Sequence, residues 1–182
     1  RVLFRSSQTR DKDALTKEGV GKVLKELADE GFDVILCDSP AGIEKGAFLA
    51  MYFADKAVVV DNPEVSSVRD SDRIIGLLDS KTRRAEAGEP LPAHLLLTRY
   101  SPGRVANGEM LSITDVEEVL GLKALGVIPE SSDVLNASNK GEPVILESSS
   151  EAGQAYDDAV ARLLGEARPM RFTTLEKKGF FS

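Results

Sequence analysis

The sequence predicts an α/β fold, with a parallel sheet and helices on both of its faces. Short apolar runs rich in β-branched residues alternate with helical patterns along the 182 residues, and this alternation is typical of parallel sheets. The run 34–37 (VILC) is apolar without interruption, as in a strand that is buried on both faces. An acid follows this run, and another follows the run 57–60. Polar side chains therefore stand where strands should end.

Periodicity and turn residues set the expected elements in chain order. Strands are expected at residues 2–5, 34–37, 57–60, 95–97 and 125–128, and helices at 16–30, 44–53, 66–78, 114–120, 133–140 and 151–164. The charged and proline-bearing segments 81–92 and 100–107 predict loops. In the last helix the apolar spacing should turn four residues toward the core: Ala155, Ala159, Val160 and Leu163.

The composition favours one globular domain and disfavours a general nucleic-acid groove. Hydrophobic residues make up 42% of the chain, which is enough for a core. The net charge of −7 and the pI of about 4.9 oppose a surface that neutralises phosphates. Cys37 is the only cysteine, so no intrachain disulfide can form, and a small buried side chain is expected there. No apolar run approaches the length of a membrane span.

Residues 34–42, VILCDSPAG, form the candidate centre of the chemistry. Asp38 stands where the strand should emerge at the carboxyl edge of the sheet, the edge at which open α/β folds bind ligands. An acid at such a tip commonly holds Mg²⁺ in nucleoside triphosphatases. Gly42 would let a backbone N–H approach a phosphate without a Cβ in the way. On these residues alone, the alternative is an acid that only caps the next helix.

The sequence contains no phosphate-binding loop of the form G-x-x-x-x-G-K-[ST]. The stretch 19–22 (GVGK) lacks the first glycine and the final hydroxyl of that motif. The chain begins at Arg1 within a strand pattern and ends at Ser182 within an apolar and basic pattern, so we expect it to be part of a longer protein. Two interpretations stay open: a nucleotide enzyme whose loop lies upstream, or a non-catalytic α/β binding module.

Several further motifs give the chain a resemblance to a known family. The stretch 38–42 (DSPAG) resembles the D-x-P-x-G switch of the deviant Walker A ATPases. The septum-site-determining (MinD) branch of that family is similar through SQTRDKDAL at 7–15, NPEVSSVRDSDR at 62–73, LLLTRY at 95–100, GVIPE at 126–130 and GEP at 141–143. The resemblance covers essentially the whole chain. It implies a P-loop NTPase-like domain over residues 1–167 without its first strands, and a tail over 168–182 that leads into a truncated membrane-targeting helix.

The resemblance implies a role for each matching position. Asp38 would be the acid near Mg²⁺, acting through a water, and Gly42 the switch glycine that senses the γ-phosphate. The adenine would lie against four residues at strand ends: Thr98, where many relatives carry Asn, and Arg99, Pro129 and Glu130. The helix that follows residue 62 would face regulatory partners through Glu64, Ser66, Asp70 and Asp72. From the residues alone, a solvated helix face is the simpler interpretation of those acids.

The implied function is an ATP- and Mg²⁺-dependent ATPase that dimerises with itself and places the division septum. Its dimer would recruit a division inhibitor (MinC) and respond to a topological-specificity factor (MinE). The protein would be cytoplasmic and attached peripherally to the inner face of the cell membrane. Without a phosphate-binding loop, the 182-residue chain is expected to be inactive alone. The alternatives are a related ParA-type ATPase that partitions DNA, an Mrp-type cargo ATPase, and the non-catalytic module.

The end of the chain predicts contact with lipid. Phe180 and Phe181 follow the basic pair Lys177 and Lys178, and such a pattern, continued, makes an amphipathic helix that lies on an anionic membrane surface. The alternative on these residues alone is a disordered tail.

Overall fold

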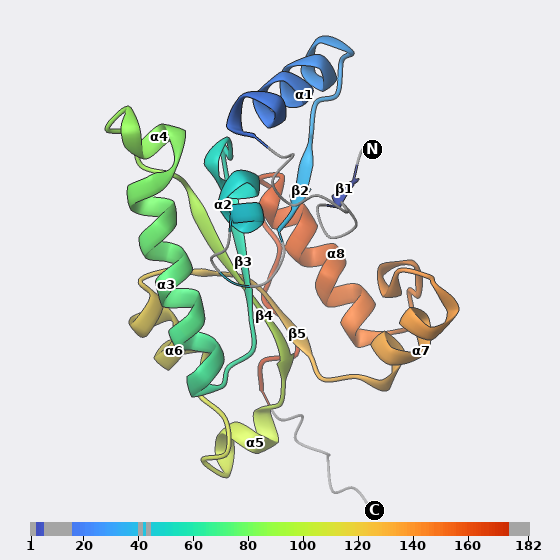
Figure 1. The fold of residues 1–182 in the computed structure, drawn as a ribbon. Helices are drawn as coiled ribbons and strands as arrows, with labels where there is room; N and C mark the ends of the chain where they lie inside the picture. Colours follow the sequence, from blue (N-terminus) through green and yellow to red (C-terminus); the bar gives the residue numbers. More distant parts are fainter. Residues whose placement is uncertain (1–2, 6–15, 40–41, 43–44, 175–182) are drawn as a thin grey trace, which may run out of the picture. The chain divides into compact units, whose positions relative to one another are not determined.

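The structure is a computed structural model and describes residues 3–5, 16–39, 42 and 45–174. The chain divides into two compact units, Arg1–Ala57 with Arg73–Pro92 and Val58–Asp72 with Ala93–Ser182. Strands alternate with helices along the chain (Figure 1). The described strands form a two-stranded sheet, β1–β2, and a three-stranded sheet, β3–β4–β5. The predicted α/β class is confirmed by this order and by the parallel pairing within both sheets.

The first unit contains β1 (Leu3–Arg5), β2 (Leu36–Asp38), α1 (Lys17–Asp29), α2 (Lys45–Tyr52) and α4 (Arg83–Glu86). β1 and β2 pair in parallel, with Leu3 opposite Leu36. The Lys17 ammonium lies 3.5 Å from the centre of the Tyr52 ring. A Cβ on Gly21 would lie 2.9 Å from the Phe53 ring. A glycine and a cation–π contact therefore bring α1 close to the aromatic end of α2.

The prediction of a strand buried on both faces at residues 34–37 is wrong. Leu36 is 60% exposed, and Cys37 is also exposed rather than buried. In the described part of the chain, β2 spans three residues and has β1 as its neighbour. So short a strand in a two-stranded sheet has few neighbours to cover its side chains. The apolar run identifies a strand, but its burial depends on elements that the run does not encode.

The second sheet has the buried strands that the sequence pattern describes. It contains β3 (Ala57–Asp61), β4 (Ala93–Tyr100) and β5 (Ala124–Pro129), with β4 in the middle. Four consecutive residues of β5, from 125 to 128, are buried, as expected for a strand covered on both faces. Leu95 and Leu97 of β4 are fully enclosed.

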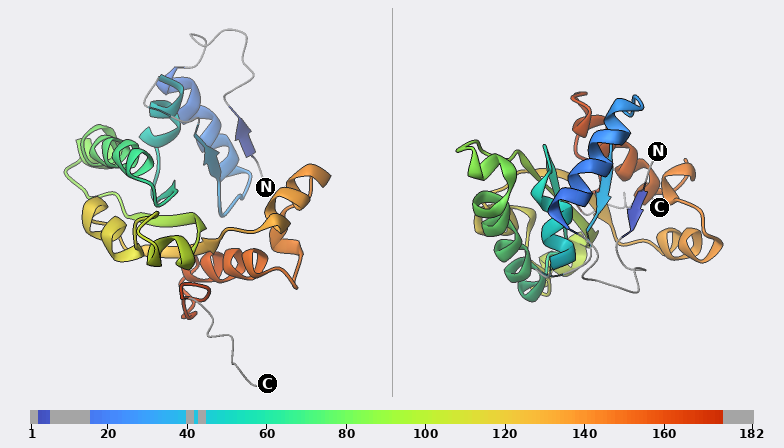
Figure 2. Two further views of the ribbon diagram at one scale, coloured as in Figure 1. Left: turned by 90° about the horizontal axis from the view of Figure 1, so that it is seen from below. Right: turned by 45° about the horizontal axis from the view of Figure 1, so that its top comes forward.

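Among its described residues, the second unit contains all or part of these helical elements: α3 (Val65–Lys81, shared with the first unit), α5 (Pro102–Ala106), α6 (Ile113–Leu120), α7 (Ser132–Lys140), the 3₁₀ turn η2 (Val144–Leu146) and α8 (Glu151–Leu163). α8 packs along β5 (Figure 2). α4 and α5 lie in segments predicted as loops. The hydroxyl caps Thr82 and Ser101 begin them by accepting backbone N–H groups of Ala85 and Arg104.

The buried face of α8 matches the predicted face only in part, and Leu163 is half-buried. Ala155 and Ala159 are buried as predicted, but Val160 is 45% exposed. Asp158 is buried instead. Each step along a helix turns the side chain by about 100°, so a face centred on the alanines leaves Val160 outside it. The paired charge on Asp158, described below, is what makes its burial tolerable.

Gly126 sets the distance between β5 and α8. A Cβ at this position would lie 2.6 Å from the Ala159 Cβ and 2.8 Å from the Leu96 Cδ1. We expect Gly126→Val to lower the free energy of unfolding by about 1–3 kcal/mol, measured by urea denaturation of the full-length protein. The control is Gly76→Ala on α3, where an added Cβ meets nothing within 4 Å and should stabilise the helix slightly. Equal urea midpoints for Gly126→Val and wild type would contradict this packing.

Candidate functional site

Polar side chains gather at the carboxyl ends of the strands in the second sheet. Asp61 ends β3, Thr98 and Arg99 lie near the end of β4, and Glu130 follows β5. In open α/β sheets this edge is where ligands bind, because loops diverge there and leave a crevice. The predicted adenine-site residues thus lie at one edge of the sheet, and Asp61 stands at the same edge, at the end of β3.

Arg99 and Glu130 pair across the ends of two neighbouring strands. Arg99 Nη2 lies 3.6 Å from Glu130 Oε1, and their side chains are 66% and 48% exposed. The Glu130 N–H donates to the Tyr100 carbonyl at 2.9 Å, next to the pairing of Tyr100 with Pro129. The register shifts between Leu97 and Tyr100, and Arg99 has a positive φ of 56°, which is unfavourable for a residue with a Cβ. Such irregularities re-aim side chains at strand ends, and here a planar guanidinium and a carboxylate stay available to a ligand.

The Thr98 hydroxyl is engaged within the protein. Its Oγ1 lies 2.8 Å from Asn62 Oδ1 and 3.3 Å from the Asp61 carbonyl oxygen. A hydroxyl has one hydrogen to donate, and the amide oxygen of Asn62 is the nearer acceptor. The adenine contact of Thr98 stays a prediction, and it would use a lone pair of the hydroxyl oxygen.

Asp61 is a buried acid that the sequence pattern left without a role. Its side chain is almost entirely buried, with 2% of the residue exposed, and its Oδ1 accepts a hydrogen bond from the Ser67 hydroxyl. Within the described part of the chain, Oδ2 is buried and has no hydrogen-bond partner. A buried polar atom without a partner is costly and calls for an explanation. The acid directly follows a β-branched run, the same signal that selected Asp38.

The predicted partner-facing residues lie on one helix and its N-terminal approach. Ser66, Asp70 and Asp72 are exposed on α3, and Glu64 is exposed just before it. The Glu64 carboxylate lies 3.9 Å from the guanidinium of Arg104. These side chains are accessible, as a binding surface requires, and none of the acids is buried in the core.

Asp38 and Gly42 belong to the first unit. Asp38 ends β2 with an exposed side chain, and Gly42 has a φ of +97°, a conformation that favours glycine. In the described residues no three His, Cys, Asp or Glu side chains form a potential metal group. A single accessible carboxylate still fits Mg²⁺, which keeps several waters and uses one or two carboxylates together with substrate phosphates.

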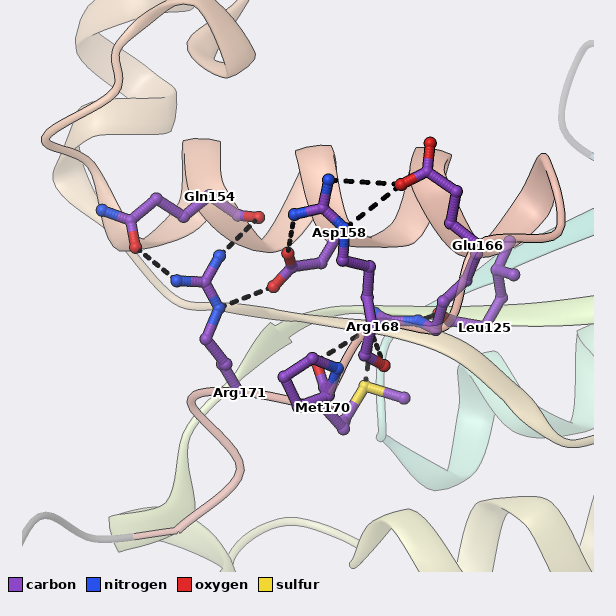
Figure 3. A network of polar contacts seen from close by, with 9 residues as sticks. Leu125, Gln154, Asp158, Glu166, Arg168, Met170 and Arg171 are labelled. Carbon is purple, nitrogen blue, oxygen red and sulfur yellow. Dashed lines mark hydrogen bonds and ion pairs between the residues drawn. The ribbon is translucent and has the colours of Figure 1, made fainter.

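A polar network fastens the segment after α8 to that helix (Figure 3). Arg171 Nε donates to the buried Asp158 carboxylate at 2.6 Å and Nη1 to Gln154 Oε1 at 2.8 Å. The hydrogen bond to Asp158 raises the pKa of Arg171. Arg162 Nη1 donates to the Pro169 carbonyl at 3.0 Å. The segment that follows α8 is therefore held against that helix.

The predicted lipid-contacting residues Phe180 and Phe181 lie outside the described residues. Among those described, no helix combines the length and apolar character needed to cross a membrane.

Known proteins resemble the chain over most of its length. No protein-family model matches it. It is 65% identical over 179 residues to the septum site-determining protein MinD of Escherichia coli K12, covering 98% of this chain and 66% of that protein. It is 63% identical over 181 residues to the MinD protein of Neisseria meningitidis serogroup B, covering 98% of this chain and 67% of that protein. The chain belongs to the MinD family of septum site-determining proteins. This MinD-family chain spans about two thirds of the length of these relatives.

Solved MinD structures share the fold. MinD of Aquifex aeolicus matches with a TM-score of 0.78 and 40% identity, over 87% of this chain and 64% of its own. The MinC:MinD complex from the same organism matches with a TM-score of 0.77 and 40% identity, over 87% of this chain and 63% of the matched chain. MinD of Pyrococcus horikoshii, complexed with Mg-ADP, matches with a TM-score of 0.66 and 26% identity, over 82% of this chain and 58% of the matched chain. These matches confirm the P-loop NTPase-like class that the resemblance implied for this MinD-family chain.

Proposed function

We propose that the protein is an ATPase that acts as a dimerising membrane switch of the Min system and places the division septum. The main observation is the exposed Arg99–Glu130 pair at the strand ends, on a chain 65% identical to Escherichia coli MinD. The proposal concerns the whole protein, because the chain corresponds to 66% of that relative's length.

The nucleotide base would lie at the carboxyl edge of β4 and β5. The Pyrococcus horikoshii protein complexed with Mg-ADP supports a nucleotide site in this fold. Arg99 offers a flat guanidinium that stacks on an aromatic ring or donates to it, and Glu130 offers an acceptor beside it. Pro129 closes the end of β5, and Thr98 lines the same edge.

Hydrolysis would depend on the end of β2. Mg²⁺ held at this end of the strand would supply positive charge that offsets the charge developing on the phosphates during hydrolysis. Asp38 would orient the metal through a water, and the N–H of Gly42 would meet the γ-phosphate. Because no phosphate-binding loop occurs in the sequence, the 182 residues alone are proposed to be inactive.

Partners would meet the exposed face of α3. The MinC:MinD complex of Aquifex aeolicus supports a division inhibitor as one partner. In our proposal ATP closes a homodimer, the dimer recruits MinC through Glu64, Ser66, Asp70 and Asp72, and MinE stimulates hydrolysis and release. The protein would be cytoplasmic between rounds of attachment.

The tail would supply membrane attachment. We place the boundary of the ATPase domain after residue 167, and the segment that follows is fastened to α8 by Arg171 and Arg162. Phe180 and Phe181 would insert into an anionic surface as part of an amphipathic helix. One such helix binds weakly, so pairing two of them in a dimer makes attachment depend on ATP.

The α3 surface gives a direct test of the partner proposal. We expect Asp70→Ala and Asp72→Ala in the full-length protein to weaken MinC binding and MinE-stimulated hydrolysis, because both acids are exposed. Their thermal midpoints should stay within a few degrees of wild type, since surface substitutions change stability by about 0.5 kcal/mol or less. Asp79→Ala is the matched control, because Asp79 is an exposed acid on the same helix. Lost stability with an intact partner response would reverse the assignment.

A further inference from the structure

Four residues join the nucleotide edge of the second unit to the first turns of α3. The Ser67 hydroxyl donates to the Asp61 carboxylate and accepts from the Asn62 N–H at 3.4 Å. The side chain of Asn62 in turn accepts from Thr98 at 2.8 Å. We call Ser67, Asp61, Asn62 and Thr98 the Asp61 network. It spans the ends of β3 and β4 and the beginning of a helix.

Asp61 is the member of the network whose side chain depends most on a single hydrogen bond. In the part of the chain that the structure describes, its Oδ1 is held by Ser67 while its Oδ2 is buried without a hydrogen-bond partner. Removing the Ser67 hydroxyl would leave the whole buried carboxyl without a hydrogen bond from a side chain. A buried carboxyl in that position must move, find water or take up a proton. The end of β3 and the first turns of α3 are therefore linked through the Ser67 hydroxyl, which contacts both Asp61 and Asn62.

The two ends of the network lie beside different surfaces. Thr98 precedes Arg99, which pairs with Glu130 at the proposed base site. Ser67 follows Ser66, which is exposed on the proposed partner surface. Ser67 itself is half-buried and faces the carboxylate. A shift of Thr98 on nucleotide binding would thus reach α3 through Asn62 and Ser67, whose hydroxyl is held in place by the Asp61 carboxylate.

We propose that Asp61 is a positioning residue that couples the nucleotide base site to the partner-binding turns of α3. This inference rests on the proposed function, and it names the contact through which that function is regulated. Coupling between two sites is reciprocal: if the base site changes partner affinity, the partner end changes nucleotide affinity by the same factor.

The test measures both affinities in variants of the full-length protein. Thr98→Val removes the hydroxyl and keeps the side-chain shape, and Ser67→Ala removes the donor to Asp61. We expect Ser67→Ala to weaken Mg-ADP binding about 5-fold or more, although Ser67 lies outside the base site. We expect Thr98→Val to weaken MinC binding at saturating nucleotide by a similar factor. For each ligand, the fold-loss of affinity in the double variant should be smaller than the product of the fold-losses in the two single variants, because both substitutions break one chain of contacts.

Two controls separate coupling from damage to the fold. Ser80→Ala makes the same change on the same helix, where the hydroxyl donates to the Gly76 carbonyl outside the network, and it should leave both affinities unchanged. Asp61→Asn keeps an acceptor for Ser67 and should stay near wild type, whereas Asp61→Leu should reproduce the Ser67→Ala effect. Thermal unfolding of each variant shows whether it is folded. If Asp61→Leu does not fold, Ser67→Ala and Thr98→Val still decide the question.

The outcomes distinguish the inference from the function beneath it. If the wild-type protein binds neither Mg-ADP nor MinC, the proposed function fails and the coupling fails with it. If the wild type binds both, but Ser67→Ala binds Mg-ADP with wild-type affinity or the two single effects multiply, only the coupling role of Asp61 is overturned.

Discussion

Asp38→Asn in the full-length protein is expected to lower Mg²⁺-dependent ATP hydrolysis by about 100-fold or more while the protein stays folded. In the proposed site the carboxylate orients a metal whose charge stabilises the transition state, and an amide of the same shape lacks that charge. The fold should survive because the Asp38 side chain is exposed at the end of β2, and exposed positions tolerate substitution. Phosphate release under saturating ATP and Mg²⁺ measures the rate, and circular dichroism checks the fold.

The matched control for this variant is Asp33→Asn. Asp33 is also exposed and precedes β2 at its opposite end, so it lies at the amino edge of the strand, away from the edge that binds ligands. Its hydrolysis rate should equal that of the wild type. Wild-type turnover in Asp38→Asn would remove Asp38 from the metal site.

The sequence predicts the second sheet well and the first one poorly, for a physical reason. β5 and β2 both begin as unbroken apolar runs, yet β5 is buried from 125 to 128 while Leu36 of β2 is 60% exposed. Local pattern encodes the strand, and burial comes from the helices and strands packed against it. Charge and proline predict loops where α4 and α5 form, although the cap residues Thr82 and Ser101 are helix-start signals in the sequence.

The candidate site was predictable only in part. The family resemblance implies Arg99 and Glu130 as site residues, and their side chains pair at 3.6 Å in the structure. The contact of Thr98 with Asn62 joins residues that are 36 positions apart, so no local pattern could show it. Asp61 carried the same signal as Asp38, an acid after a β-branched run, but the likeness gave it no role. Its burial and its bond to Ser67 depend on how β3 meets α3.

Full-length protein is expected to bind anionic vesicles about tenfold more tightly with ATP than with ADP, or by a larger factor. The reason is the number of anchors: a short amphipathic helix with two inserted aromatics holds a monomer weakly, and a dimer presents two such helices at once. The fastening of residues 168–171 to α8 keeps the linker to each anchor short. A short linker raises the effective concentration of the second anchor once the first is bound.

The measurement that tests the switch most directly is co-sedimentation of the full-length protein with anionic vesicles in the presence of Mg²⁺ and either ATP or ADP. The proposed switch predicts protein in the vesicle pellet with ATP, little with ADP, and little with either nucleotide when Phe180 and Phe181 are both changed to Ser. Equal binding in ATP and ADP by the wild-type protein would contradict an ATP-dependent membrane switch.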